Sequence, residues 1–305
     1  MNYQLQLHTE MSVQLQTELD TEVELPVRNA LQKWLAPIFS DTAKDVDLRF
    51  FSEELDELRH QIKEEINDNR TSYTIYLPKE NYMHLAVANI ASNPQVRLLG
   101  GEHAASMELY LEQDQAINSL NTGIFTARLP MHVNDSSTEF DVHLYMVTAA
   151  VALVVDPGDC SELVSLTGSM MGSADGFSIR DSVFTYKIPP YINMEDIINI
   201  NPPSASVGAR TSMRQAEFPE RLCMAVVSLP TEDNQTWSIT MNATLTDNRH
   251  TKTILTVKEP LKAGTLRIIK CRMGNKGDFE PASNSEVGAT VELDWKEGTE
   301  IEVDM

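Results

Sequence analysis

The sequence is poor in basic residues, and it has no long hydrophobic run. Its 24 Lys and Arg residues stand against 45 Asp and Glu residues, which gives a formal net charge of −21 at pH 7. This charge repels phosphate backbones and anionic lipid surfaces, so nucleic acid is not expected as a partner. The longest apolar run, MVTAAVALVV at 146–155, is too short to span a bilayer as a helix. We therefore predict no membrane-spanning helix.

Cysteine is also scarce. Cys160, Cys223 and Cys271 are an odd number with no short spacing, so neither a disulfide framework nor a zinc site is indicated. We expect all three to be unpaired small hydrophobic residues. The N-terminus lacks the basic and apolar regions of an export signal. The compartment therefore has to be inferred from other features.

The motifs of the common enzyme classes are missing as well. TGSMMGSADG at 167–176 has neither the Lys-Ser/Thr of a phosphate loop nor the spacing of a dinucleotide fingerprint, so it is predicted to form a turn. Oxygen-rich DPGDC at 156–160 and NDNR at 67–70 lack the spacing of a calcium loop. The seven histidines are spread singly, and four on expected strands are predicted to face solvent: His8, His84, His132 and His143. We therefore predict no catalytic residue, cofactor or metal ligand.

The main pattern in the sequence is the alternation of apolar and polar residues. From Tyr3 to Leu25 an apolar residue or threonine occupies every odd position, a period of two that is typical of strands. We expect this ribbon to span both sheets of a first domain, with an exposed loop at 26–31. Further strands are predicted at 46–51, 72–78, 82–90, 106–113, 123–133 and 140–155, and eight more follow. Spacing of three and four among apolar residues predicts a helix at 52–66, and Pro and Asn predict a long loop at 189–220.

Many short strands at intervals of about 8 to 14 residues favour sandwiches over a parallel sheet. The predicted fold is all-β, with two transthyretin-like or Ig-like Greek-key β-sandwich domains and one short helical insert. The predicted domains are residues 1–138 and 139–305.

Three segments resemble the Bacteroidetes fimbrillin superfamily of type V pili: DVDLRFF followed by TIYLPKENYMHLAVANI, then FDVHLYMVTAAVALVV, and finally VELDWKEGTEIEVDM. The resemblance implies a non-enzymatic fimbrial (pilus) subunit, anchor or adhesin on the outer membrane of a Gram-negative bacterium. It implies strand exchange with other fimbrial subunits, further ligands on host or bacterial surfaces, and membrane attachment only through a lipid anchor absent from this chain.

Two other functions stay open. One is a surface carbohydrate-binding protein of similar architecture, in which Trp34, Tyr191 and Trp237 form a stacking platform, although lone aromatics on strands are typical of a core. The other is a periplasmic enzyme, which needs a closed pocket with paired carboxylates.

The resemblance also implies two sites. Arg28 is the first basic residue of the chain and the candidate site of proteolytic processing. The candidate donor strand lies at the other end and comprises Val287, Val291, Leu293, Trp295, Ile301, Val303 and Met305. An ordinary first strand pair and an ordinary closing hairpin explain the same two patterns.

Overall fold

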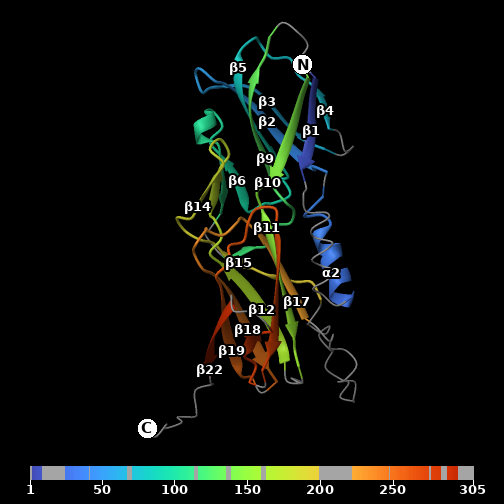
Figure 1. The fold of residues 1–305 in the computed structure, drawn as a ribbon, viewed down its shortest axis with the longest axis vertical. Coiled ribbons are helices and arrows are strands. Elements are labelled where there is room, and N and C mark those ends of the chain that lie inside the picture. The colour runs from blue at the N-terminus through green and yellow to red at the C-terminus, as the bar shows by residue number, and fades with distance from the viewer. Residues whose placement is uncertain are drawn as a thin grey trace.

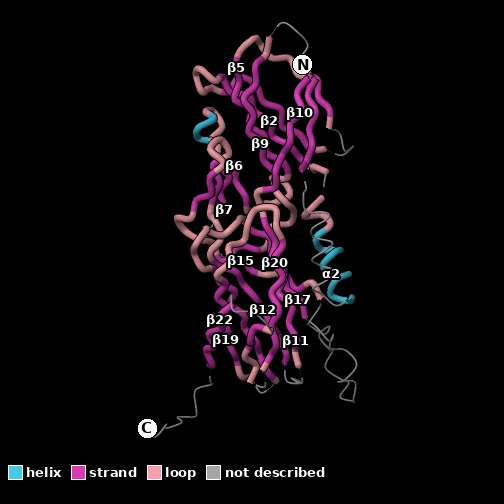
Figure 2. The backbone as a smooth tube through the Cα atoms, viewed as in Figure 1, coloured by secondary structure: helices cyan, strands magenta, loops and turns pink. Residues whose placement is uncertain are grey.

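The structure is a computed structural model that describes residues 2–8, 25–40, 42–66, 71–112, 116–134, 139–158, 163–198, 222–246, 248–274, 276–282 and 287–294. These residues are mostly β-strand, as Figure 2 shows. The strands form four sheets, and the molecule is elongated (Figure 1). The predicted all-β fold is therefore confirmed.

A seven-stranded sheet contains most of the N-terminal half and has the order β3-β2-β5-β9-β10-β1-β4. Its strands are β1 (Asn2–His8), β2 (Asp45–Ser52), β3 (Leu58–Glu65), β4 (Ser72–Thr74), β5 (Asn81–Ala88), β9 (Phe125–His132) and β10 (Glu139–Met146). Tyr3 of β1 and Phe50 of β2 have ring centroids 6.3 Å apart, although three strands separate β1 from β2 in the sheet. The sheet therefore curls, and its concave face encloses a core.

A four-stranded sheet, in the order β14-β13-β7-β6, packs beside the first. It consists of β6 (Val96–Leu99), β7 (Glu108–Leu111), β13 (Gly176–Ser178) and β14 (Val183–Thr185), and the 3-10 helix η1 (Ala104–Ser106) precedes β7. Arg128 of β9 donates from Nη1 to the carbonyl oxygen of Arg180 at 2.7 Å. Gly101 has φ +121°, and a Cβ there would lie 1.6 Å from Nη1 of Arg49. Only glycine lets the connecting loop approach the sheet this closely.

Two further sheets face each other in the C-terminal half. The five-stranded sheet has the order β16-β17-β11-β20-β21, with β11 (Ala149–Asp156), β16 (Glu195–Asp196), β17 (Leu222–Ser228), β20 (Leu266–Met273) and β21 (Phe279–Pro281). The six-stranded sheet has the order β22-β19-β18-β12-β15-β8, with β8 (Ile117–Asn118), β12 (Leu163–Met171), β15 (Tyr191–Asn193), β18 (Trp237–Leu245), β19 (His250–Val257) and β22 (Val287–Asp294). A Cβ on Gly168 of β12 would lie 3.0 Å from Cε of Met224 on β17, so the sheets are in close contact.

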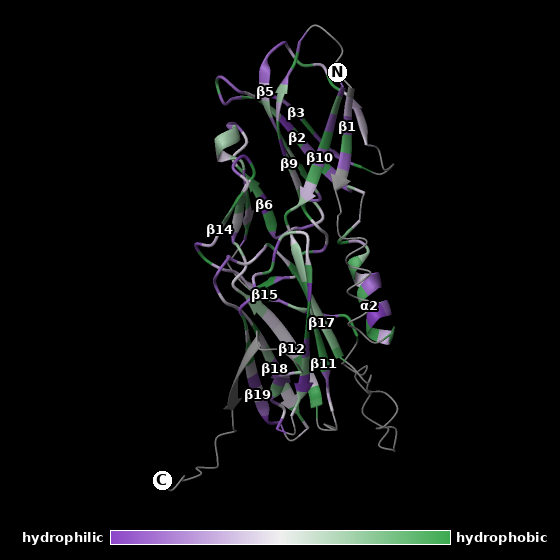
Figure 3. Ribbon diagram, viewed as in Figure 1, coloured by the Kyte–Doolittle hydropathy of each residue, from purple (hydrophilic) through white to green (hydrophobic). Residues whose placement is uncertain are grey.

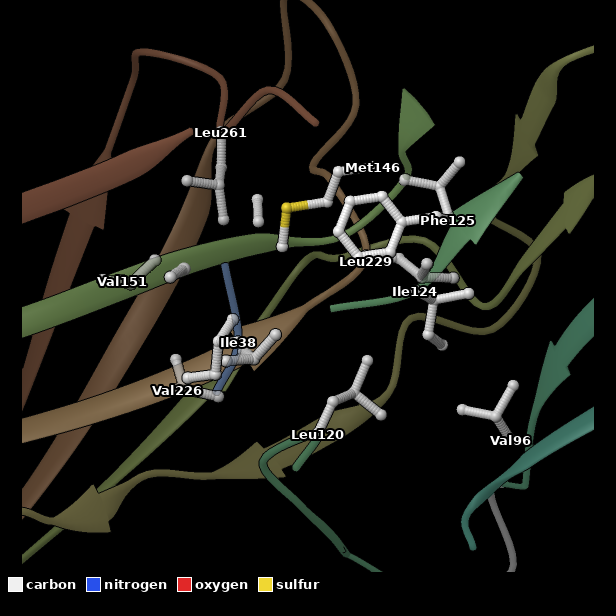
Figure 4. Close-up of a cluster of buried hydrophobic side chains, with 14 of the residues drawn as sticks. Ile38, Val96, Leu120, Ile124, Phe125, Met146, Val151, Val226, Leu229 and Leu261 are labelled. Carbon is white, nitrogen blue, oxygen red and sulfur yellow. The ribbon is translucent and has the colours of Figure 1, made fainter. Parts of the chain in front are cut away.

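The chain passes from the seven-stranded to the five-stranded sheet between β10 and β11, at Val147 and Thr148. The predicted single strand at 140–155 is therefore two strands. Pairing also crosses this junction, because β7 pairs with β13 and β8 pairs with β15. Buried residues from both sides, including Phe125 and Val226, form one cluster (Figure 4). The domain division at 138/139 stays a prediction.

The α-helix within the described ranges is α2 (Leu25–Leu35), so the loop predicted at 26–31 is wrong. Pro26 suits the first turn, where a missing N–H costs nothing. Three apolar residues recur every four positions and are buried: Val27, Leu31 and Leu35. Figure 3 shows the green and purple faces of this amphipathic helix. The alternating ribbon predicted at 3–25 forms β1 up to His8, and residues 9–24 lie outside the described ranges.

The helix predicted at 52–66 is also wrong, because residues 58–65 form β3. This strand lies at the edge of the seven-stranded sheet, and half-buried and exposed residues alternate along it. Edge strands tolerate Lys and Glu, which protect them from unwanted pairing, and these residues also imitate a helix. The loop predicted at 189–220 contains the strands β15 and β16, and residues 199–221 lie outside the described ranges.

Candidate strand-exchange site

The first strand of the chain fills a groove between two strands that are remote from it in sequence. β1 runs parallel to β10, with Gln6 opposite His143, and antiparallel to β4, with Tyr3 opposite Tyr73. The amide of Leu5 also donates to the carbonyl oxygen of Thr71 at 2.7 Å. We call the space between β10 and β4 the β1 groove. Backbone groups on both of its sides are available to hold a strand.

Tyr3 of β1 is 0% exposed. Its ring meets the rings of Phe50, Tyr73 and His84 edge to face, with centroids 6.3, 6.1 and 5.3 Å away. His84 of β5 stacks on Phe50 at 4.3 Å and is itself fully buried. Edge-to-face and stacked arrangements are the favourable geometries for aromatic pairs. We call Phe50, Tyr73 and His84 the aromatic pocket.

Hydrogen bonds identify the tautomer of His84. Its Nδ1 lies 2.9 Å from the carbonyl oxygen of Arg49, which can only accept. The proton of the neutral ring is therefore on Nδ1, and Nε2 is an acceptor. The hydroxyl of Tyr3 lies 2.6 Å from Nε2 and must donate to it. The aromatic pocket consequently requires a donor from the strand in the β1 groove.

Burial fixes the charge states of both partners. It lowers the pKa of His84 from the usual 6.5 to about 4, against the opposing effect of the hydrogen bond to Arg49. Burial, with a smaller contribution from Tyr73, raises the pKa of Tyr3. Both groups are therefore neutral near pH 7. The prediction that His84 faces solvent is wrong, because β5 is covered on both faces, whereas His132 and His143 are exposed as predicted.

A cleft of about 390 Å³ lies beside β2 and β3, and several charged residues line it. Asp45 accepts hydrogen bonds from the amides of Ile90 and Ala91, and burial raises its pKa. Asp47 forms a two-bond ion pair with Arg49, at 2.9 Å for each bond. Both carboxylates therefore form hydrogen bonds that stabilise the fold.

The candidate processing residue, Arg28, lies in the first turn of α2 and is half buried. Cleavage there would require this turn to open locally. Processing at Arg28 stays a prediction.

Part of the candidate donor strand lies in β22. Val287, Val291 and Leu293 pair with Val257, Thr253 and Thr251 of β19 in the six-stranded sheet. The other candidates lie outside the described ranges: Trp295, Ile301, Val303 and Met305. Strand donation also stays a prediction.

The three aromatic residues considered for sugar stacking do not share an exposed face. Trp237 is 2% exposed and donates to the carbonyl oxygen of Glu259, so it belongs to the core. Trp34 is half buried and donates to Glu195 of β16 at 2.9 Å, and Tyr191 is 39% exposed. A platform of these three residues is therefore excluded.

Cys223 and Cys271 are buried free thiols, and Cys160 lies outside the described ranges. No group of three or more His, Cys, Asp or Glu residues that could hold a metal ion occurs within the described ranges. Among the residues that the structure describes, no helix is long and apolar enough to cross a membrane.

Solved structures define the class of this fold. A candidate adhesin of Bacteroides ovatus has a TM-score of 0.56 at 10% identity, covering 98% of this chain and 96% of its own. A candidate adhesin of Bacteroides thetaiotaomicron also scores 0.56 at 10% identity, with 92% of each chain covered. A further Bacteroides thetaiotaomicron protein, described as a candidate polysaccharide-binding protein, scores 0.55 at 9% identity, covering 98% of this chain and 99% of its own. The fold is therefore that of these Bacteroides β-proteins.

The sequence gives the family directly. Residues 16–300 match the profile of the fimbrillin-A associated anchor proteins Mfa1 and Mfa2, and the chain belongs to this family. No curated protein sequence matches it. The expected resemblance to the fimbrillin superfamily is therefore confirmed.

Proposed function

We propose that this protein is a non-enzymatic fimbrial subunit, anchor or adhesin on the outer membrane of a Gram-negative bacterium. We further propose that it joins other fimbrial subunits by strand exchange. Membership of the fimbrial anchor family supports the first proposal. The position of β1 in its groove supports the second.

The observation that carries strand exchange is the insertion of β1 between two strands that are remote from it in sequence. β1 lies between β10 and β4, and its inward residues Tyr3 and Leu5 are 0% and 2% exposed. Both neighbours contribute backbone pairing, which any chain of suitable side-chain pattern can satisfy. A strand from another subunit could therefore occupy an equivalent groove.

The C-terminal end supplies a candidate for such a strand. Apolar residues alternate from Val287 to Trp295 and again from Ile301 to Met305, and β22 pairs with β19 at the edge of the six-stranded sheet. We propose that residues after β22 extend the strand and enter a groove of a neighbouring subunit.

Deleting residues 299–305 tests strand donation in the cells that make the protein. We expect an unchanged melting curve for the purified variant and loss of its co-purification with fimbrial subunits. A lowered melting temperature would show that these residues close their own sandwich. Undiminished co-purification would refute donation directly.

Antibody labelling of intact cells tests the location. An antibody raised against the folded protein should label intact cells as strongly as it labels lysed cells. Labelling only after lysis would contradict a surface location.

A further inference from the structure

The N-terminal sequence by itself leaves the register of β1 ambiguous. Apolar residues or threonines occupy every odd position from Tyr3 to Leu25, so a slip of two residues keeps the same alternation. A slip of one residue would put polar side chains into the core and is excluded. Tyr3 is the only Phe, Tyr or Trp among the first 25 residues. It is therefore the one aromatic side chain at the odd positions of this segment.

The aromatic pocket suits a tyrosine and not the other side chains of this segment. A two-residue slip would place Leu5 where Tyr3 lies, and leucine has no donor for Nε2 of His84. That nitrogen is enclosed, because His84 is 0% exposed. Leaving a buried acceptor without a partner carries a free-energy cost, which is added to the lost ring contacts.

We propose that Tyr3 and His84 form a register lock, in which the aromatic pocket accepts a tyrosine and so fixes the position of the strand in the β1 groove. His84 acts through its acceptor nitrogen and Phe50 through the face on which His84 stacks. The backbone pairing with β10 and β4 holds a strand, and the register lock selects how far along the groove it sits.

The same chemistry determines which foreign strand the groove can accept. An incoming strand must carry an aromatic side chain with a hydrogen-bond donor at the position of Tyr3, followed two residues later by an aliphatic residue. This specificity for a tyrosine-bearing strand rests on the proposed strand exchange, whereas the register lock within one chain does not.

Disulfide trapping in the full-length chain tests the register lock. Gln6 lies opposite His143, so the pair Gln6→Cys and His143→Cys reports the native register. The pairs Gln4→Cys with His143→Cys and His8→Cys with His143→Cys report slips of two residues. With Tyr3 present, we expect the native pair to cross-link at least about tenfold faster than either slip pair. The variant Tyr3→Leu should remove this excess, and its persistence would overturn the proposal.

Two variants separate the hydrogen bond from the shape of the ring. Tyr3→Phe keeps the ring and loses the donor, so it should reduce the native excess. Combining Tyr3→Phe with His84→Leu removes the unpaired acceptor and should restore most of that excess. A full excess in Tyr3→Phe alone, or no recovery in the double variant, would overturn the role of His84.

Tyr145→Phe is the matched control. Tyr145 lies on β10 beside β1 and is 58% exposed, outside the aromatic pocket. Loss of its hydroxyl should leave the native excess unchanged. A register change as large as that of Tyr3→Phe would show that any tyrosine hydroxyl near β1 has the same effect, which would overturn the proposal.

Peptide competition tests the specificity for an incoming strand. The full-length Tyr3→Leu protein is mixed with a labelled NYQLQLH peptide, which copies residues 2–8, or with the same peptide carrying leucine for tyrosine. The tyrosine peptide should bind at least about tenfold more tightly. Equal affinities would overturn the specificity. If trapping and peptide binding succeed while co-purification of fimbrial subunits is unaffected by the C-terminal deletion, strand donation fails and the register lock stands.

Discussion

Acidification should loosen the seven-stranded sheet, because His84 would have to take up a proton inside a site that excludes water. Its pKa is lowered from the usual 6.5 to about 4 by burial. Between these two values the unfolded chain binds more protons than the folded one, so stability falls as the pH falls. The stability that depends on a neutral His84 is fully present above pH 6.5 and is lost by about pH 4. The pKa difference corresponds to roughly 3 kcal/mol of unfolding free energy.

Hydrogen exchange in urea measures this effect locally. Peptides that cover β5 give an opening free energy for the region of His84 when the rates are corrected for the intrinsic dependence on pH. We expect this free energy to fall steadily between pH 6.5 and about 4 in the unmodified protein. The variant His84→Gln has no imidazole to protonate. Its opening free energy should therefore lack the part of the fall that His84 causes, even if this variant is less stable at every pH.

The difference between the two curves isolates His84 from the 45 Asp and Glu residues, which titrate in part of the same range. His132→Gln, at an exposed position on β9, is the matched control and should keep the slope of the unmodified protein. Parallel curves for the unmodified protein and His84→Gln would refute the reasoning, because they would show that burial of His84 has no linked cost.

Two further predictions concern packing. Gly101→Ala should lower the free energy of unfolding by roughly 2 kcal/mol or more, because its Cβ would meet Nη1 of Arg49, a guanidinium that two hydrogen bonds to Asp47 hold in place. Gly264→Ala, at φ +70° with no atom within 4 Å, should cost only about 1 kcal/mol. Equal losses in urea unfolding would contradict the steric argument. Thiol titration should find three free thiols in the denatured chain, and any intrachain disulfide would contradict this result. In the native protein Cys223 and Cys271 should react slowly, because burial raises the pKa of both thiols, to about 12 for Cys271.

The strands could be predicted where their alternation was clear. β18 and β19 bury every second residue, as their sequences indicate. β3 was mistaken for a helix because its Lys and Glu residues suit both structures, although Leu58, His60 and Ile62 already alternate. The helix α2 is not predicted because the alternation that precedes it ends at Leu25, where the fourfold spacing of Val27 and Leu31 begins.

The aromatic pocket could not be predicted from local pattern. Tyr3, Phe50, Tyr73 and His84 belong to four different strands, and only the curl of the sheet brings them together. His84 is a lone histidine among strand residues, a pattern that predicts a side chain facing solvent. Its burial depends on Tyr3 and Phe50, which belong to strands distant from β5 in sequence.

The strand pairs that cross the junction between the two halves affect how the molecule carries mechanical load. Besides the covalent link at Val147 and Thr148, the ladder between β7 and β13 and the pairing of β8 with β15 join the halves. The amide of Leu111 donates to the carbonyl oxygen of Asp175, and the amide of Leu120 donates to the carbonyl oxygen of Val227. Tension applied to the two ends must break these bonds before the halves can separate. In a single-molecule pulling measurement we therefore expect the halves to rupture together, and an early low-force separation would show that the cross-pairing bears no load.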